Sequence, residues 1–335
     1  MDVLVIGGTH FLGKNVVRTL VDHGHNVASL NIDPAAKTLL PSGVESIQCN
    51  RKDHERLRTT LAGRKFDAVA DIVYAPTRPE DVAAVMDALG RDFRRYVYTS
   101  STTVYRKTGL YPITEDDPKD AKAAYGPYTK DKLDCENFLF EEFRARGTPV
   151  SVIRPGKIYG PENYTYREGF HFDRLTHHRP VLVPGNGSQL IQFGYVEDVA
   201  DAYRLAMERD EAVGEAFTVT GRQTQTLDAY LDLLMEITGV HTRKVYFDPK
   251  LVERIQQPGL FFGEPARWGE GHDCYDVSKA RERIGYQPRV SIEEGMRRAY
   301  EWYVESGGDS YRTRVLDWSF EDELIRLADE AAKAG

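Results

Sequence analysis

Cysteine is scarce in this chain of 335 residues, which has only three: Cys49, Cys135 and Cys274. They lie far apart and show no CxxC or Cys/His ligand spacing, so the sequence predicts neither a disulfide framework nor a metal site. Long apolar runs are missing too, and no stretch approaches membrane-spanning length. No basic leader precedes the first apolar run, Val3 to Ile6. We therefore expect a protein of the reducing cytoplasm with no membrane partner.

Dense runs of lysine and arginine are also absent. The chain has 44 Lys and Arg residues against 52 Asp and Glu residues, which gives a net charge of -8. Because binding to a phosphate backbone depends on clustered cations, nucleic acid is not expected as a partner. The length allows a large core in one large domain or in two closely packed domains.

What the first half does contain is an alternation of short β-branched runs with helical patterns. We expect strands near 2–6, 27–30, 44–48, 67–73, 95–99 and 150–154. We expect helices at about 11–23, 54–62, 79–91 and 128–146. This alternation predicts a doubly wound α/β fold, a parallel sheet of the Rossmann type with helices on both faces.

After Pro155 the pattern loosens into segments rich in Gly, Pro and Tyr, which are typical of loops that line a cleft. A new helix is expected to begin after Thr226 as its N-cap and to end at Gly239. We therefore expect a smaller, mixed second domain. The expected division is 1–160 plus about 190–220 for dinucleotide binding, about 161–189 and 221–318 for substrate, and 319–335 as a C-terminal packing helix.

The stretch VLVIGGTHFLGKNVV, residues 3–17, has glycines between a predicted strand and a predicted helix. In that context a glycine pattern predicts a site for a dinucleotide phosphate, with a plain turn as the alternative. The expected cofactor residues here are Gly7, Gly8, Thr9, His10, Phe11, Leu12 and Gly13. His10 stands where the middle glycine usually lies, and a positive φ there would cost roughly 1 to 3 kcal/mol.

The ends of the second and third predicted strands bear on the choice of cofactor. Asn31 lies where an NAD-binding protein often has an acidic residue for the ribose, and Asp33 follows closely. No arginine stands there to meet a 2'-phosphate, which favours NAD. Asn50 and Arg51 follow the third strand, and Arg51 could serve an NADP phosphate, so NADP stays an alternative.

Tyr128 and Lys132 are four residues apart on a predicted helix and therefore share one face. The spacing alone is weak, because the same pattern recurs at Tyr246. The context is stronger: the fifth strand delivers Ser100 and Ser101 to the carboxyl edge of the sheet, where ligands bind in this architecture.

Several motifs together resemble one family. They are the glycine loop, the Ser-Ser-x-x-Val-Tyr strand end, Tyr-x-x-x-Lys, RPGKIYGP at 154–161, FGYVEDVADA at 193–202 and YDVSKARERIGYQPRVSIEEG at 275–295. The chain resembles the extended short-chain dehydrogenase/reductase superfamily, with its nucleotide-sugar epimerases and dehydratases. The form GGTHFLG resembles the atypical branch, in which the middle glycine is replaced.

This resemblance implies an NAD(P)-dependent epimerase that oxidises and re-reduces one carbon of a nucleotide sugar, commonly as a homodimer. Tyr128 would be the general acid/base, Lys132 would hold the nicotinamide ribose and lower the tyrosine pKa, and Ser101 would bond the reacting oxygen. The resemblance also implies a cofactor contact at Pro155. The implied substrate residues are Ser101, Thr102, Tyr128, Lys157 and Arg267.

The sequence departs from the family pattern at several positions. Lys157 replaces a common asparagine, Ile191 replaces an arginine, and DIVYAPT replaces the usual His-Leu-Ala-Ala after the fourth strand. Thr102 and Thr103 stand where 4,6-dehydratases have an Asp-Glu pair, which disfavours elimination of water. Two alternatives stay open: an NAD(P)-dependent reductase or dehydrogenase of a small polyol or secondary metabolite, and a non-catalytic relative that binds RNA or a ligand.

Overall fold

The larger part of the molecule is built on a seven-stranded parallel sheet. The computed structural model describes residues 1–73, 76–121, 126–255, 271–307 and 316–334. The strand order is β10-β6-β5-β4-β1-β2-β3. The strands are β1 (Asp2–Ile6), β2 (Asn26–Asn31), β3 (Glu45–Gln48), β4 (Ala68–Asp71), β5 (Arg95–Thr99), β6 (Val150–Pro155) and β10 (Glu215–Val219). The order reverses between β1 and β4, which is where ligands bind in open α/β sheets.

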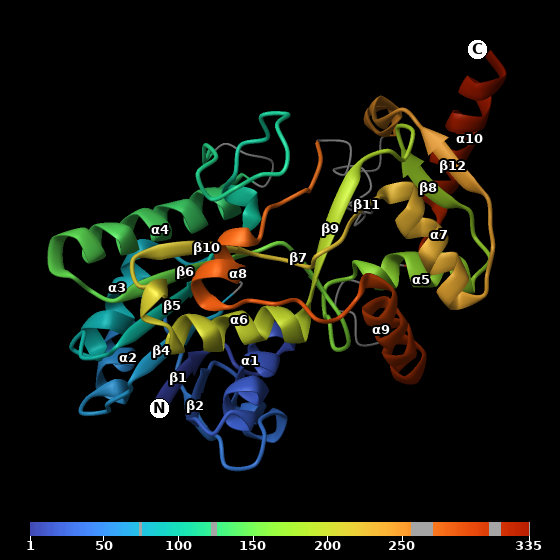
Figure 1. Cartoon of the computed structure of the whole chain (residues 1–335). Helices are drawn as coiled ribbons and strands as arrows, with labels where there is room; N and C mark the ends of the chain where they lie inside the picture. Colours follow the sequence, from blue (N-terminus) through green and yellow to red (C-terminus); the bar gives the residue numbers. More distant parts are fainter. Residues whose placement is uncertain (74–75, 122–125, 256–270, 308–315, 335) are drawn as a thin grey trace.

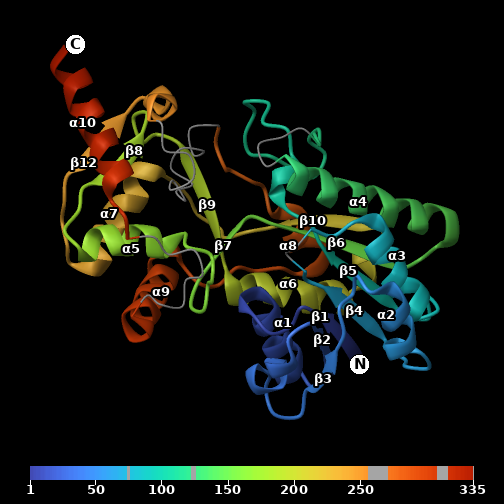
Figure 2. The same ribbon diagram turned by 180° about the vertical axis from the view of Figure 1, so that it is seen from behind.

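Helices cover both faces of this sheet, as Figures 1 and 2 show. On one face lie α1 (Phe11–Asp22), α6 (Val196–Glu208) and α8 (Ser278–Ile284). On the other lie α2 (His54–Leu61), α3 (Pro79–Ala88) and α4 (Pro127–Arg146). Alternate residues of β1 serve the two cores, because Val3 and Val5 pack with α1 and α6 while Leu4 and Ile6 pack with α2 and α3. The expected doubly wound fold is confirmed.

A smaller part packs beside the carboxyl edge of the sheet. It contains the mixed sheet β11-β9-β7, the two-stranded sheet β12-β8 and, among the described residues, four α-helices. Their bounds are β7 (Lys157–Tyr159), β8 (Val181–Pro184), β9 (Leu190–Tyr195), β11 (Thr224–Thr226), β12 (Lys244–Phe247), α5 (Glu168–Thr176), α7 (Leu227–Thr238), α9 (Ile292–Ser306) and α10 (Ser319–Ala334). Helix α7 begins and ends as expected, because the Thr226 hydroxyl accepts a hydrogen bond from the Ala229 amide and Gly239 is left-handed.

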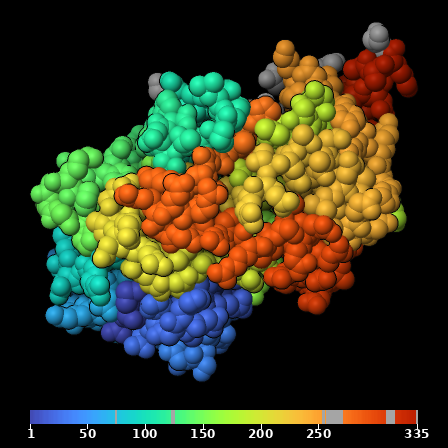
Figure 3. Space-filling view, in the orientation of Figure 1, coloured from blue at the N-terminus to red at the C-terminus, as the bar shows by residue number. Residues whose placement is uncertain are grey.

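Helix α10 is amphipathic and packs through one face. Phe320 and Leu324 join a core cluster with Leu182 and Phe247 of the two-stranded sheet. Its Glu321 forms a buried ion pair with Arg174 of α5. In the space-filling view the segment with α8 and α9, coloured orange, runs as a band across the larger and smaller parts (Figure 3).

The described residues also form four short 3-10 helices: η1 (Pro34–Leu39), η2 (Thr102–Val104), η3 (Asp210–Ala212) and η4 (Pro249–Arg254). Within the described ranges, no helix combines the length and the apolar character needed to cross a membrane.

Candidate active site

The glycine loop between β1 and α1 is packed so closely that side chains do not fit. Gly7 has a φ of +88°, and its amide donates a hydrogen bond to the Leu30 carbonyl at 3.0 Å. A β-carbon at Gly13 would lie 1.9 Å from the Gly7 carbonyl oxygen, and one at Gly8 would lie 2.3 Å from the Ser29 hydroxyl oxygen. The glycines therefore bring the amides that begin α1 to the carboxyl edge of the sheet, which is the arrangement that cradles a phosphate. Thr9 and Leu12 of the loop are buried.

His10 does not carry the strain considered from the sequence. Its backbone is extended, with a φ of -128°, and its side chain is exposed. The next residue, Phe11, has the positive φ, at 38°. The backbone therefore needs no glycine at position 10, and the loop can keep its shape with an imidazole there.

A second segment, the loop after β7, lies against the glycine loop. The Tyr164 ring contacts the rings of His10 and Phe11 edge to face, at centroid distances of 6.4 and 6.3 Å. Glu162 of the same segment pairs with Lys14 of α1 at 2.6 Å. The segment after β7 thus contacts the glycine loop and the start of α1 directly.

Lys132 of α4 is buried, and its ammonium group contacts the end of β5. Its Nζ donates hydrogen bonds to the Thr99 carbonyl at 2.7 Å and to the Val73 carbonyl at 3.3 Å. The ammonium lies 5.7 Å from the centre of the Tyr128 ring, one helical turn away on α4. Burial lowers the pKa of Lys132 to about 8, although the Asp71 carboxylate opposes the shift. At neutral pH the lysine is still mostly protonated and provides a cation beside Tyr128.

Hydroxyl groups gather where β5 ends. Ser101 and Thr102 are buried, and the Ser101 hydroxyl accepts a hydrogen bond from the Thr103 amide at 3.2 Å. The buried hydroxyls of Ser100 and Thr103 have no hydrogen-bond partner among the residues that the structure describes. Lys132 donates to the carbonyl of Thr99, the residue directly before Ser100, so this group of hydroxyls begins next to the lysine.

The residues expected near the adenosine half of a dinucleotide differ in exposure. Asn31 is buried, and its amide donates to the Ser29 carbonyl at 3.0 Å. Asp33 and Asn50 are exposed at the ends of β2 and β3. Asp33 caps η1, and Asn50 accepts a hydrogen bond from the Lys52 amide.

Arg51 faces the interior, contrary to the phosphate-binding role weighed from the sequence. It is 4% exposed, and its Nη1 donates to Asp71 Oδ1 at 2.5 Å. A 2'-phosphate would have to be met at the surface, and the Arg51 charge is instead neutralised by a buried carboxylate. This pairing favours NAD over NADP.

Lys157 of β7 is part of an ion-pair cluster with Asp273 and Lys107. Its Nζ lies 2.5 Å from Asp273 Oδ2, and Lys107 Nζ lies 2.6 Å from Asp273 Oδ1. The Tyr275 hydroxyl also donates to Asp273, at 2.8 Å. Burial would raise the pKa of Asp273, but the two lysines hold it well below its usual range. The cluster therefore carries one net positive charge.

The two remaining residues expected at the site are Pro155, for the cofactor, and Arg267, for the substrate. Pro155 is the last residue of β6, buried beside the site. Arg267 lies outside the described residues.

Asp71, Asp273 and Tyr164 were not predicted from the sequence, because only folding brings them to Arg51, Lys157 and His10. One signal was available for Asp71: it opens the segment DIVYAPT, which departs from the family pattern, and Arg51 follows the third predicted strand. Opposite charges after the third and fourth strands could have been paired, because the carboxyl ends of parallel strands lie along one edge of the sheet.

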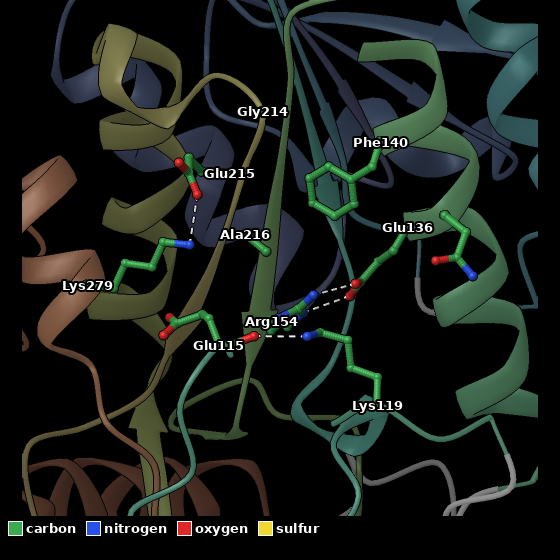
Figure 4. A pocket seen from close by; sticks show the side chains of 10 residues that line it. Glu115, Lys119, Glu136, Phe140, Arg154, Gly214, Glu215, Ala216 and Lys279 are labelled. Atoms are coloured by element: carbon green, nitrogen blue, oxygen red, sulfur yellow. Dashed lines mark hydrogen bonds and ion pairs between the residues drawn. The ribbon is translucent and has the colours of Figure 1, made fainter. Parts of the chain in front are cut away.

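A pocket of about 250 Å³ lies apart from these residues, between α4, β6, β10 and α8 (Figure 4). It is lined by ten residues, and none of them is an expected site residue. Its charged side chains already have partners: Arg154 binds Glu136, and Lys279 binds Glu215. Among the described residues no group of three or more His, Cys, Asp or Glu is arranged to hold a metal.

Known proteins resemble the chain over most of its length. The chloroplast stem-loop binding protein of 41 kDa b of Arabidopsis thaliana is 29% identical, over 96% of this chain and 84% of that protein. The UDP-glucose 4-epimerase of Thermotoga maritima, solved with UDP-glucose, superposes with a TM-score of 0.74 at 22% identity, covering 91% of this chain and 99% of that one. The UDP-glucuronic acid 4-epimerase of Bacillus cereus, solved with UDP-glucuronic acid and NAD, superposes with a TM-score of 0.71 at 19% identity. The superposition covers 91% of this chain and 100% of that one.

The family assignment follows from a match over most of the larger part. The model of the NAD dependent epimerase/dehydratase family matches residues 3–220, which include the glycine loop, the end of β5 and the Tyr128 and Lys132 pair. The chain belongs to the NAD dependent epimerase/dehydratase family, and its cofactor is NAD.

Proposed function

We propose that the protein is an NAD-dependent epimerase that acts on a nucleotide sugar by transient oxidation and re-reduction at one carbon. The observation that carries this proposal is the Lys132 ammonium, buried and bonded to the end of β5, 5.7 Å from the Tyr128 ring. A cation in that position favours the phenolate of a neighbouring tyrosine, which is what a general base needs.

In this proposal each residue has one task. Tyr128 takes the proton from a sugar hydroxyl and later returns it, while the Ser101 hydroxyl holds the same oxygen. Lys132 keeps the phenolate accessible through its charge. NAD, when bound, supplies the reversible oxidation of the sugar carbon. Proton transfer by a positioned group of this kind contributes about 10² to 10⁴ in rate.

The residues of this chain suit NAD on physical grounds. The glycine loop forms a cradle that any β-carbon at Gly8 or Gly13 would fill. Asp33 and Asn50 are exposed at neighbouring strand ends, where the adenosine ribose and base would lie. We propose that Arg51 makes no direct contact with the cofactor, because it is turned toward Asp71.

On the substrate side we propose that the ion-pair cluster of Lys157, Lys107 and Asp273 lies beside the diphosphate. Its net positive charge suits an anion. Epimerisation is favoured over dehydration because Thr102 and Thr103 cannot supply the acid and base that elimination of water requires. A homodimer and a cytoplasmic location stay predictions.

Mass spectrometry of ligands released when the purified protein is denatured tests the cofactor first. Retained NAD supports an enzyme that regenerates its cofactor in each turnover. Candidate nucleotide sugars are then incubated with the protein in heavy water. The expected product is a stereoisomer of unchanged mass, with no deuterium on carbon and no net reduced cofactor. A product lighter by one water contradicts the proposal, and accumulating reduced cofactor identifies a dehydrogenase that oxidises the substrate without re-reducing it.

Binding of a structured RNA is a second candidate, favoured by the 29% identity to a protein named for stem-loop binding. The net charge of -8 weighs against it. Titration of the protein with stem-loop RNA at physiological salt, with an unstructured RNA of equal length as control, distinguishes the two. Specific stem-loop binding that survives Tyr128→Phe, with no conversion of any nucleotide sugar, would replace the epimerase proposal.

A further inference from the structure

Arg51 and Asp71 form a buried ion pair that the proposed chemistry does not use. Both side chains are at most 5% exposed, and the bond between Nη1 and Oδ1 is 2.5 Å. The second carboxylate oxygen accepts a hydrogen bond from the Tyr96 hydroxyl at 2.7 Å. Two of the Arg51 nitrogens, Nε and Nη2, have no hydrogen-bond partner within the described part of the chain. Such a pair is a poor stabilising device, because buried guanidinium donors without partners cost free energy.

A chain of hydrogen bonds connects this ion pair to the catalytic lysine. The Thr99 hydroxyl donates to the Asp71 backbone carbonyl at 2.7 Å. The Thr99 carbonyl in turn accepts the bond from Lys132 Nζ, also at 2.7 Å. Asp71 ends β4 and Thr99 ends β5, so the ion pair lies at the strand ends against which the lysine is held.

We propose that the Arg51 and Asp71 pair positions Lys132, with Asp71 as the counter-charge of the ammonium and Arg51 as the group that keeps Asp71 in place. The inference rests on the role of Lys132 in the proposed function. Arg51 is thereby a positioning residue, and it acts only through Asp71.

The electrostatic surroundings of Lys132 agree with this geometry. Burial lowers its pKa, and Asp71 is the foremost of the charges that oppose the shift. Arg51 acts in the opposite sense to Asp71. The groups that face the lysine are Asp71, Cys135, Arg51 and Glu136, together with the rings of Tyr98 and Tyr128. Removal of the Asp71 carboxylate should therefore lower the pKa of Lys132, and removal of the Arg51 guanidinium should raise it.

The test compares Asp71→Asn, Arg51→Met and the apolar double variant Arg51→Met/Asp71→Leu. Unfolding by urea is followed from neutral pH to pH 10.5 without cofactor. Stability of the wild type should rise with pH from about 8, because the unfolded chain keeps the lysine proton up to 10.5 while the native protein releases it earlier. Asp71→Asn should move the start of this rise down by about one pH unit. Arg51→Met should move it up, and the double variant should stay close to the wild type.

Glu321→Gln provides a matched control, because it breaks a buried ion pair in the smaller part. It should lower stability without moving the start of the rise. Where turnover is measurable, Asp71→Asn should have a kcat about fivefold lower than the wild type at pH 8, because a smaller fraction of Lys132 is protonated in the variant at that pH. If the pH at which stability begins to rise moves in the same direction in both single variants, or does not move, the proposal is overturned and the ion pair has only a structural role.

The urea experiment needs no substrate and no cofactor. If no nucleotide sugar is converted but the opposite shifts occur, the proposed function fails while the positioning of Lys132 stands. If Asp71→Asn does not fold, Arg51→Met and the double variant decide the question alone.

Discussion

Replacing Lys132 with methionine should stabilise the cofactor-free protein at neutral pH while abolishing turnover. The lysine has its pKa lowered from 10.5 to about 8 by burial. At about 1.4 kcal/mol for each pH unit, keeping the charge buried lowers the free energy of unfolding by about 3 kcal/mol below pH 8. Methionine has a similar length and removes this penalty.

The substitution also leaves two carbonyl groups without their donor. Lys132 donates to Thr99 and to Val73, and losing each hydrogen bond costs about 1 kcal/mol. The expected net gain at neutral pH is therefore about 1 kcal/mol. Above pH 10.5 the lysine is neutral in both the native and the unfolded state, so the variant should be less stable by about 2 kcal/mol.

The sign of the stability difference should thus reverse between pH 8 and pH 10.5. Urea unfolding of both proteins across this range measures the difference, and Lys130→Met is a matched control. Lys130 lies on the same helix, exposed, in an ion pair with Asp134. Its replacement should change stability little over this range. A Lys132→Met difference that does not vary with pH would refute the reasoning.

Three further predictions concern single side chains of the site. Tyr128→Phe should lower kcat by about two orders of magnitude with NAD affinity unchanged in calorimetry, whereas Tyr246→Phe, at an exposed strand position, should be neutral. An equal loss of kcat in both variants would mean that the catalytic helix has been assigned wrongly. Gly13→Ala should weaken NAD binding at least tenfold, because its β-carbon would lie 1.9 Å from a loop carbonyl oxygen; wild-type affinity would show that the loop is not the phosphate site. His10→Gly should weaken NAD binding a few-fold, since it relieves no strain and removes the contact with Tyr164. Tighter binding would mean that this contact holds the loop in an unproductive position.

Most of the larger part could be predicted from the sequence because its signals are local. A buried β-branched run followed by a glycine turn and an apolar helix pattern defines β1, the loop and α1 within one short segment. The cap at Thr226 and the left-handed Gly239 likewise involve only neighbouring residues. The spacing of Tyr128 and Lys132 follows from helix geometry, so their common face was predictable before any tertiary contact was known.

The tertiary structure alone decided how the charges of the site are used. Whether Arg51 meets a phosphate or a carboxylate depends on Asp71, twenty residues later on another strand. Whether Lys157 is solvated depends on Asp273, which lies 116 residues further along the chain. The position of the left-handed residue, Phe11 and not His10, is set by how the loop packs. A side chain's local pattern determines the element and the face on which it lies, but its charge state and partners depend on groups that only folding brings within a few ångströms.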